Sequence, residues 1–188
     1  FPEPLFAGSD RALRRWHNER NERLFREDIK DVEFVRDLGN MQLLSDMLPG
    51  RVGSLLSANS LREDLEVSHR AVSHWLDILE RFYYHFRIRP FTWSKIRSLK
   101  KEPKLYLWDL SEVPDEAARF ENMVASHLLK LVHWLTDREG YKADLYFLRD
   151  TAKREVDFLV AVAGKPWFAV EVKSQSEHLA PTLPYFRD

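Results

Sequence analysis

Apolar residues recur at helical spacing throughout the first half of the chain. Residues 9–30 form a charged helical pattern after a Ser9-Asp10 cap signal, and a second pattern over 33–48 closes at Pro49-Gly50. Ser60 precedes a short predicted helix, 61–65. Ser68 precedes a longer helix with Ala71, Val72, Trp75, Leu76, Leu79 and Phe82 on one face. These patterns predict a helical N-terminal region.

The two helices around residues 66–68 have the spacing of a helix-turn-helix. The exposed start of the second helix carries small polar and basic side chains that suit contacts with phosphates and base edges: Ser68, His69, Arg70, Ser73 and His74. Asp77 on the same surface weakens that interpretation. A dimerisation or interdomain module is the alternative.

Alternation of apolar and polar residues dominates the second half. Residues 83–109 are predicted to form the wing of a winged helix, followed by a helix over 116–136 and strands over 145–149, 155–163 and 167–173. The expected fold class is α+β or α/β, with a winged helix-turn-helix before a mixed sheet flanked by helices. The expected boundaries are a linking helix at 1–30, the winged helix at 31–110 and a last domain at 111–188.

Charged residues interrupt the last two apolar strands. The period of two places Glu171 and Lys173 on one face of a strand. Asp157 shares that face if the connecting loop has an odd number of residues or a bulge lies near Gly164. Glu121 begins an apolar stripe on the helix over 116–136, where a buried carboxylate requires a partner. We therefore expect these four side chains to converge at one end of the sheet.

A basic stretch crosses the predicted wing. Residues 81–104 contain eight Lys or Arg against one acid, a net charge of +7, interleaved with aromatic residues. Such a stripe is typical of a nucleic-acid surface, and a charged edge hairpin is the alternative. The predicted phosphate contacts are Arg97, Lys100, Lys101 and Lys104.

The composition of the chain excludes some kinds of site and of cellular location. The 188 residues include no cysteine, which excludes disulfides and thiolate metal sites, and no apolar run approaches the roughly 20 residues of a membrane helix. We expect a cytoplasmic protein without a membrane partner. The chain starts at Phe1 without an initiator methionine, which is expected of a fragment of a longer protein.

The helix carboxylate followed by a hairpin with Asp157 and Glu171-Val172-Lys173 resembles the PD-(D/E)XK nuclease superfamily, which has the restriction-endonuclease-like fold. The resemblance implies that Asp157 and Glu171 ligate Mg²⁺ or Mn²⁺, with the Val172 carbonyl as a further ligand. It also implies that Lys173 positions the attacking water and that Glu121 supports the site.

A longer series of motifs is similar to the C-terminal half of prokaryotic AAA-type ATPases that end in a domain of unknown function. The series comprises Phe1-Pro2-Glu3-Pro4, Arg15-Trp16, Asp28-Ile29, the helix-turn-helix, Pro103-Lys104-Leu105-Tyr106 with Asp109, Phe120-Glu121-Asn122, Tyr146 with Arg149, Glu155-Val156-Asp157-Phe158 and Glu171-Val172-Lys173. The chain departs from that family in having Ala118-Arg119 where a glycine is common.

The second resemblance implies an N-terminal ATPase domain as a partner, and a homo-oligomer is a further expectation. The chain has no Gly-x-x-x-x-Gly-Lys-Ser/Thr, so we expect ATP to bind only in that missing domain. The expected function is a metal-dependent nuclease with a DNA-binding winged helix. The alternative is a catalytically inactive DNA-binding, protein-binding or oligomerisation module of the ATPase.

Overall fold

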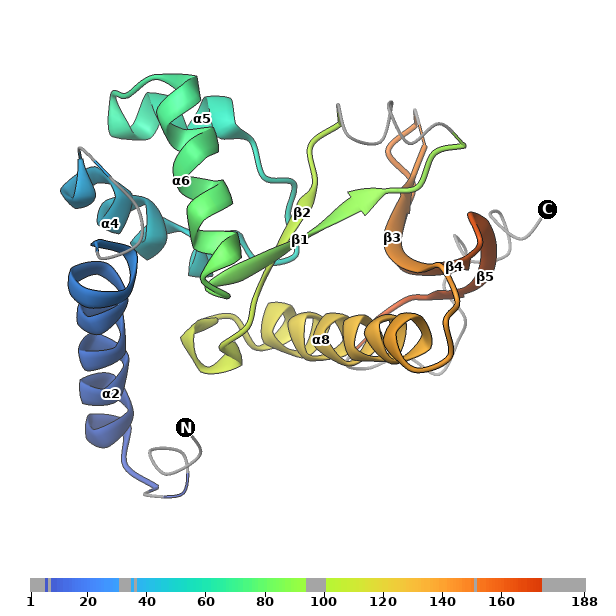
Figure 1. Ribbon diagram of the computed structural model, residues 1–188, viewed down its shortest axis with the longest axis horizontal. Coiled ribbons are helices and arrows are strands. Elements are labelled where there is room, and N and C mark those ends of the chain that lie inside the picture. Colours follow the sequence, from blue (N-terminus) through green and yellow to red (C-terminus); the bar gives the residue numbers. More distant parts are fainter. Residues whose placement is uncertain are drawn as a thin grey trace. The chain divides into compact units, whose positions relative to one another are not determined.

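The computed structural model describes residues 6, 8–30, 35, 37–93, 101–150 and 152–173 (Figure 1). The chain divides into two compact units, one formed by Phe1–Met47 with Ala58–Phe82 and the other by Leu48–Ser57 with Tyr83–Asp188. In the part of the chain that is described, no helix is long and apolar enough to cross a membrane.

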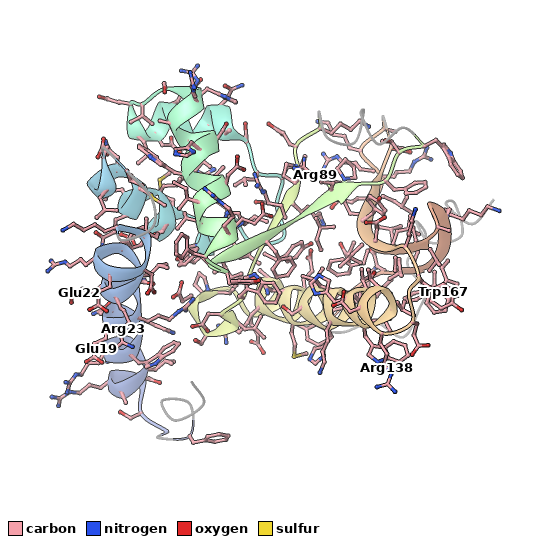
Figure 2. The ribbon with its side chains drawn as sticks, in the orientation of Figure 1. Glu19, Glu22, Arg23, Arg89, Arg138 and Trp167 are labelled. Atoms are coloured by element: carbon pink, nitrogen blue, oxygen red, sulfur yellow. The ribbon has the colours of Figure 1, made fainter. Side chains whose placement is uncertain are left out.

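The first unit is helical. Helix α2 (Asp10–Arg23) begins where the Ser9 hydroxyl accepts a hydrogen bond from the Ala12 amide, which confirms the predicted cap, and it continues into a π-helix, η1 (Leu24–Ile29). α2 has no buried residue, and its charged side chains, among them Glu19, Glu22 and Arg23, project from the ribbon (Figure 2). The burial begins only in η1, whose apolar side chains are Leu24, Phe25 and Ile29.

Three further helices of this unit contact one another: α4 (Leu38–Met47), α5 (Ala58–Leu65) and α6 (His69–Arg81). Glu66 adopts a left-handed conformation (φ 55°) in the turn between α5 and α6. The Ser68 hydroxyl then accepts from the Ala71 amide at 3.1 Å, as predicted for the start of α6. The amphipathic α6 buries Val72, Trp75, Leu76, Ile78 and Leu79.

The second unit is a mixed five-stranded sheet with the order β2-β1-β3-β4-β5. Its strands are β1 (His85–Pro90), β2 (Lys104–Leu107), β3 (Ala143–Arg149), β4 (Glu155–Val162) and β5 (Lys165–Val170). β1 and β3 are parallel, and the other neighbours are antiparallel. The helix α8 (Glu116–Asp137) packs against β2, β3 and β4 (Figure 1).

The strands predicted as a wing differ from the expectation. β1 and β2 belong to the sheet of the second unit, because the end of β1 pairs with β3, with Arg89 opposite Tyr146 and Pro90 opposite Phe147. The segment Leu48–Ser57 also joins this unit, since the Gly53 amide donates to the Leu105 carbonyl at 2.9 Å and the Leu56 amide to the Pro103 carbonyl at 2.8 Å. The boundary expected at residue 110 therefore does not coincide with the compact units.

Asn122 fastens α8 to the end of β2. Its side-chain oxygen accepts from the Leu107 amide at 2.7 Å, and its side-chain nitrogen donates to the Leu107 carbonyl at 2.8 Å. Asn122 is fully buried, so this pairing satisfies polar groups that water cannot reach. The preceding residue, Glu121, is thereby held above the sheet.

Candidate active site

The hairpin of β4 and β5 brings the predicted acidic residues to facing positions. The connecting turn has two residues, Ala163 (φ 52°) and Gly164 (φ 77°), and is therefore not the odd loop that is one of the two expected arrangements. An even turn alone would place Glu171 and Asp157 on opposite faces. The register shifts by one residue at Trp167, because Ala161 pairs with Pro166 whereas Val160 pairs with Phe168.

The bulge returns Glu171 to the same face of the sheet as Asp157. Phe158 pairs with Val170, the last residue of β5, so the same register continued by one residue sets Glu171 opposite Asp157. The strand ends three residues earlier than predicted, at Val170, and residues 171–173 follow it as irregular backbone. The Asp157 Oδ2 atom accepts from the Val172 amide at 2.8 Å and ties this segment to β4.

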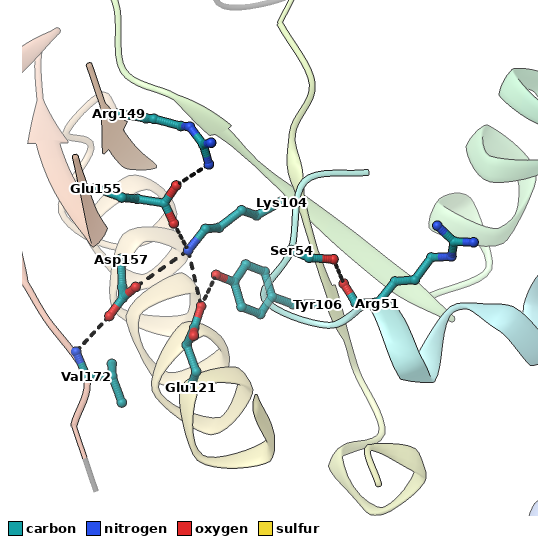
Figure 3. A network of polar contacts seen from close by, with 9 residues as sticks. All are labelled: Arg51, Ser54, Lys104, Tyr106, Glu121, Arg149, Glu155, Asp157 and Val172. Carbon is teal, nitrogen blue, oxygen red and sulfur yellow. Dashed lines mark hydrogen bonds and ion pairs between the residues drawn. The ribbon is translucent and has the colours of Figure 1, made fainter. Parts of the chain in front are cut away.

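A lysine lies at the centre of the acidic residues (Figure 3). The Nζ atom of Lys104 is 2.6 Å from Glu155 Oε1, 3.4 Å from Glu121 Oε1 and 3.5 Å from Asp157 Oδ1. Its side chain is only 3% exposed. Lys104 therefore cannot make the phosphate contact predicted from the basic stretch, and its charge faces the interior of the sheet domain.

Two more side chains extend this network. The Tyr106 hydroxyl donates to Glu121 Oε1 at 2.7 Å, and Arg149 donates to Glu155 Oε2 at 2.8 Å. Lys104 and Tyr106 are two residues apart in β2 and hence project from the same face of the strand. Tyr106 is held in place by Phe86 and Phe158, with ring centroids 5.6 and 5.7 Å away.

The pKa values of these groups follow from burial and from each other's charges. Burial lowers the pKa of Lys104, but Glu121, Glu155 and Asp157 outweigh it, so the pKa is raised above the usual 10.5. The stability that Lys104 contributes is therefore present at neutral pH and is lost only as the pH rises through the raised pKa. Burial also raises the pKa of Tyr106 well above 10, and its hydroxyl remains a donor.

Glu121 and Glu171 are shifted in the same direction. Burial raises the pKa of Glu121, opposed by Lys104 and by the Tyr106 hydroxyl. Burial and the neighbouring Asp157 raise the pKa of Glu171, opposed by Lys173, the Asp157 amide and Lys104. The Glu171 Oε2 atom is buried and has no hydrogen-bond partner among the described residues.

A cleft of about 550 Å³ opens beside this cluster. It is lined by the loop Val52–Ser54, the first turns of α8 as far as Glu121, and the segment with Val172 and Lys173. Gly53 (φ 75°) lies so close to the Glu121 carboxylate that a Cβ there would be 3.2 Å from both of its oxygens. The loop thus closes over Glu121, and Lys173 is exposed at the cleft.

The structure thus brings together Glu121, Asp157 and the segment 171–173. The sequence reasoning did not find Lys104 as a partner of the acids, nor Tyr106, Glu155 and Arg149. The signal was present, because Lys104 and Tyr106 alternate within an apolar strand and Glu155 precedes Asp157 by two residues on one face of β4.

The other residues predicted to bind DNA are divided between the two units. His69, Arg70 and His74 are exposed on α6, Ser68 is exposed as its N-cap, and Ser73 is half-buried with its hydroxyl 3.4 Å from His69 Nδ1. Lys101 is exposed in the second unit. Arg97 and Lys100 lie outside the described residues.

Comparison with protein families divides the chain near α8. The model of a domain of unknown function, DUF8612, matches residues 1–113, more than half of the chain. The chain belongs to this family. A second model, also a domain of unknown function (DUF4143), matches residues 117–187. No curated protein and no solved structure matches the chain.

The candidate site draws on both family matches. Lys104 and Tyr106 lie within the DUF8612 match, whereas Glu121, Asp157 and Glu171 lie within the DUF4143 match. The five-stranded sheet is divided in the same way, since β1 and β2 precede residue 113 and β3, β4 and β5 follow residue 117. A lysine of one match therefore contacts three acids of the other, Glu121, Glu155 and Asp157.

We predict that Glu171→Gln raises the melting temperature at pH 7 in a metal-free buffer. The folded state holds a proton on Glu171 more tightly than the unfolded state, so its ionisation costs stability as the pH rises above the ordinary value of 4.5. The amide carries no charge and avoids this cost. The difference between variant and wild type should vanish below pH 4.5.

Thermal unfolding followed by circular dichroism between pH 3.5 and 8 measures this difference. The exposed Glu102→Gln serves as the control and should show no such pH-dependent gain. A Glu171→Gln protein that is less stable than wild type at pH 7 would contradict the prediction.

Proposed function

We propose that this chain carries a divalent-metal-dependent site for phosphodiester hydrolysis, of the PD-(D/E)XK nuclease type. The proposal rests on one observation: Glu121 from α8, Asp157 from β4 and the segment 171–173 after β5 meet beside one cleft. Packing of the core alone does not account for this grouping, because burying carboxylates in a sheet costs free energy unless they are neutralised. The residues 171–173 include the lysine that such a reaction requires.

The donor set suits a hard cation. Carboxylate and carbonyl oxygens are the ligands that Mg²⁺ and Mn²⁺ prefer. Asp157, Glu171 and the Val172 carbonyl would hold the ion, and the Oε2 atom of Glu171, which has no hydrogen-bond partner among the described residues, is available as a ligand. A bound divalent ion would supply Lewis acidity and lower the pKa of a coordinated water.

The remaining residues act on the substrate and on the water. Lys173, exposed at the cleft, would hold the attacking water and stabilise the negative charge that develops on the phosphate. The N-terminal turn of α8 lines the same cleft, and the positive end of its dipole favours a phosphate. Glu121, fixed by Tyr106 and Lys104, supports the acidic side of the site.

A specific observation favours a second candidate function. Lys104 and Arg149 already neutralise much of the acidic cluster, so the domain does not require a metal to bury its carboxylates. A nuclease-like scaffold that binds DNA or a protein without cleaving it would also be stable with this arrangement. Activity assays separate the two candidates.

We expect Lys173→Ala to lower Mg²⁺- or Mn²⁺-dependent cleavage by about 10²–10³-fold, the effect of removing one preorganised electrostatic stabiliser. Asp157→Asn should cost at least as much, since it weakens the proposed metal site. Cleavage is measured on single-stranded DNA, double-stranded DNA and RNA, with the exposed Lys165→Ala as the control. Wild-type protein that cleaves none of these substrates with either ion would leave the binding scaffold as the function.

We also propose that α6 contacts DNA, as the second helix of a helix-turn-helix. Three observations support it: the turn at 66–68, the cap at Ser68, and the exposed side chains of His69, Arg70 and His74. The match to DUF4143 is consistent with a domain associated with AAA-type ATPases, and we propose such an ATPase as the source of the chain.

The DNA contact predicts a defined salt dependence. If Arg70 neutralises one phosphate, Arg70→Ala should reduce the slope of log affinity against log salt by about 0.9. Fluorescence anisotropy with a labelled duplex measures the slope between about 50 and 200 mM salt, a range over which the affinity of such contacts for DNA falls steeply. Arg14→Ala, an exposed residue of α2, is the control and should leave the slope unchanged. An unchanged slope for Arg70→Ala would count against a role of α6 in binding.

A further inference from the structure

In the proposed reaction the buried Lys104 serves only to fix Glu121, although its contacts extend further. Its ammonium contacts one oxygen from each of three carboxylates: Oε1 of Glu155, Oε1 of Glu121 and Oδ1 of Asp157. A lysine ammonium has three donors, so these three acceptors use its full capacity. Figure 3 shows the three carboxylates surrounding the end of the side chain, with Lys104 approaching from β2.

The acidic cluster has two sides that differ in whether the carboxylate oxygens have partners. On one side Lys104 takes one oxygen of Asp157, and the other oxygen of Asp157 accepts from the Val172 amide. On the other side Glu171 retains a buried oxygen with no partner among the described residues. Glu121 and Glu155 are engaged on the Lys104 side, by Lys104, Tyr106 and Arg149.

We propose that Lys104 is a positioning residue that takes the place of a second cation, so that the site holds one divalent ion. This inference rests on the proposed function. The fixed ammonium holds Glu121 and Asp157 in their orientations and repels a second ion from the carboxylates it contacts. The single ion would then be bound by Asp157, Glu171 and the Val172 carbonyl.

A Mn²⁺ titration counts the ions directly. Isothermal calorimetry and the EPR signal of free Mn²⁺ should give one bound ion for wild type and for Lys104→Arg, which keeps the charge. Lys104→Met should bind two, because three carboxylates lose their common counter-charge. The exposed Lys142→Met is the matched control and should bind one.

Thermal stability separates positioning from a merely structural role. Lys104→Met should melt at a lower temperature than wild type in EDTA, and Mn²⁺ should restore most of the loss. A loss of equal size with and without Mn²⁺ would overturn the inference, as would a single ion bound with unchanged affinity. Wild-type protein that binds no Mn²⁺ would instead overturn the proposed function itself.

The variant can fail to fold without metal, since it leaves buried carboxylates unpaired. Lys104→Met combined with Glu155→Gln removes one positive and one negative charge together and avoids that problem. Its Mn²⁺ affinity should exceed that of wild type by about tenfold or more, because the positive charge that contacts the proposed ligand Asp157 is gone, whereas the lost negative charge belongs to Glu155, which is not a proposed ligand. An equal or weaker affinity would overturn the role of Lys104.

Discussion

The contact of the Lys104 ammonium with three carboxylates is the interaction on which the sheet domain depends. Charges are buried in proteins only when they are paired, and here one cation serves Glu121, Glu155 and Asp157. The contact joins β2, α8 and β4, which are distant in sequence. Removing either sign of charge would leave the other unpaired in the interior, so the fold and the site cannot be separated.

The same network explains how the second unit keeps several carboxylates close together in fixed orientations. Tyr106, Arg149 and the Val172 amide each satisfy an oxygen of the cluster, which fixes the carboxylates before any ligand binds. Preorganisation of this kind is what a catalytic site requires, because orienting charges during the reaction would cost free energy. Burial raises the pKa of both Glu121 and Glu171, so the carboxylates of this cluster are held at a cost in stability.

Local elements of this fold could be predicted from the sequence, because their signals are local. The caps at Ser9 and Ser68 and the long helix from Glu116 are found where the pattern placed them. The mixed α+β class was also predicted, whereas the identity of its two expected folds stays a prediction. The pairing of β1 with β3 was missed, since strand pairing joins segments far apart in sequence and leaves no local signal.

The predicted convergence of the acidic residues is found in the structure, whereas their roles stay a prediction and their buried counter-charge, Lys104, was not predicted. Asp157 and Glu171 stand out in the sequence because carboxylates are rare in apolar strands. Of the two expected arrangements, an odd loop or a bulge, the structure has the bulge, at Trp167. The basic stretch over 81–104 predicts a surface position for Lys104, because it is the last base of that run. The alternation of Lys104 and Tyr106 within an apolar strand was the signal in the sequence, and the contacts of the Lys104 ammonium show that its side chain points inward.

A crystal structure of the protein grown with Mn²⁺ tests the central claim most directly, through anomalous scattering at the manganese edge. We expect one anomalous peak, bound by Asp157 and Glu171, with the Lys104 ammonium still in contact with Glu121, Glu155 and Asp157. A peak at the position of the Lys104 ammonium would contradict the account. The absence of any peak near these carboxylates in crystals grown with millimolar Mn²⁺ would contradict it as well.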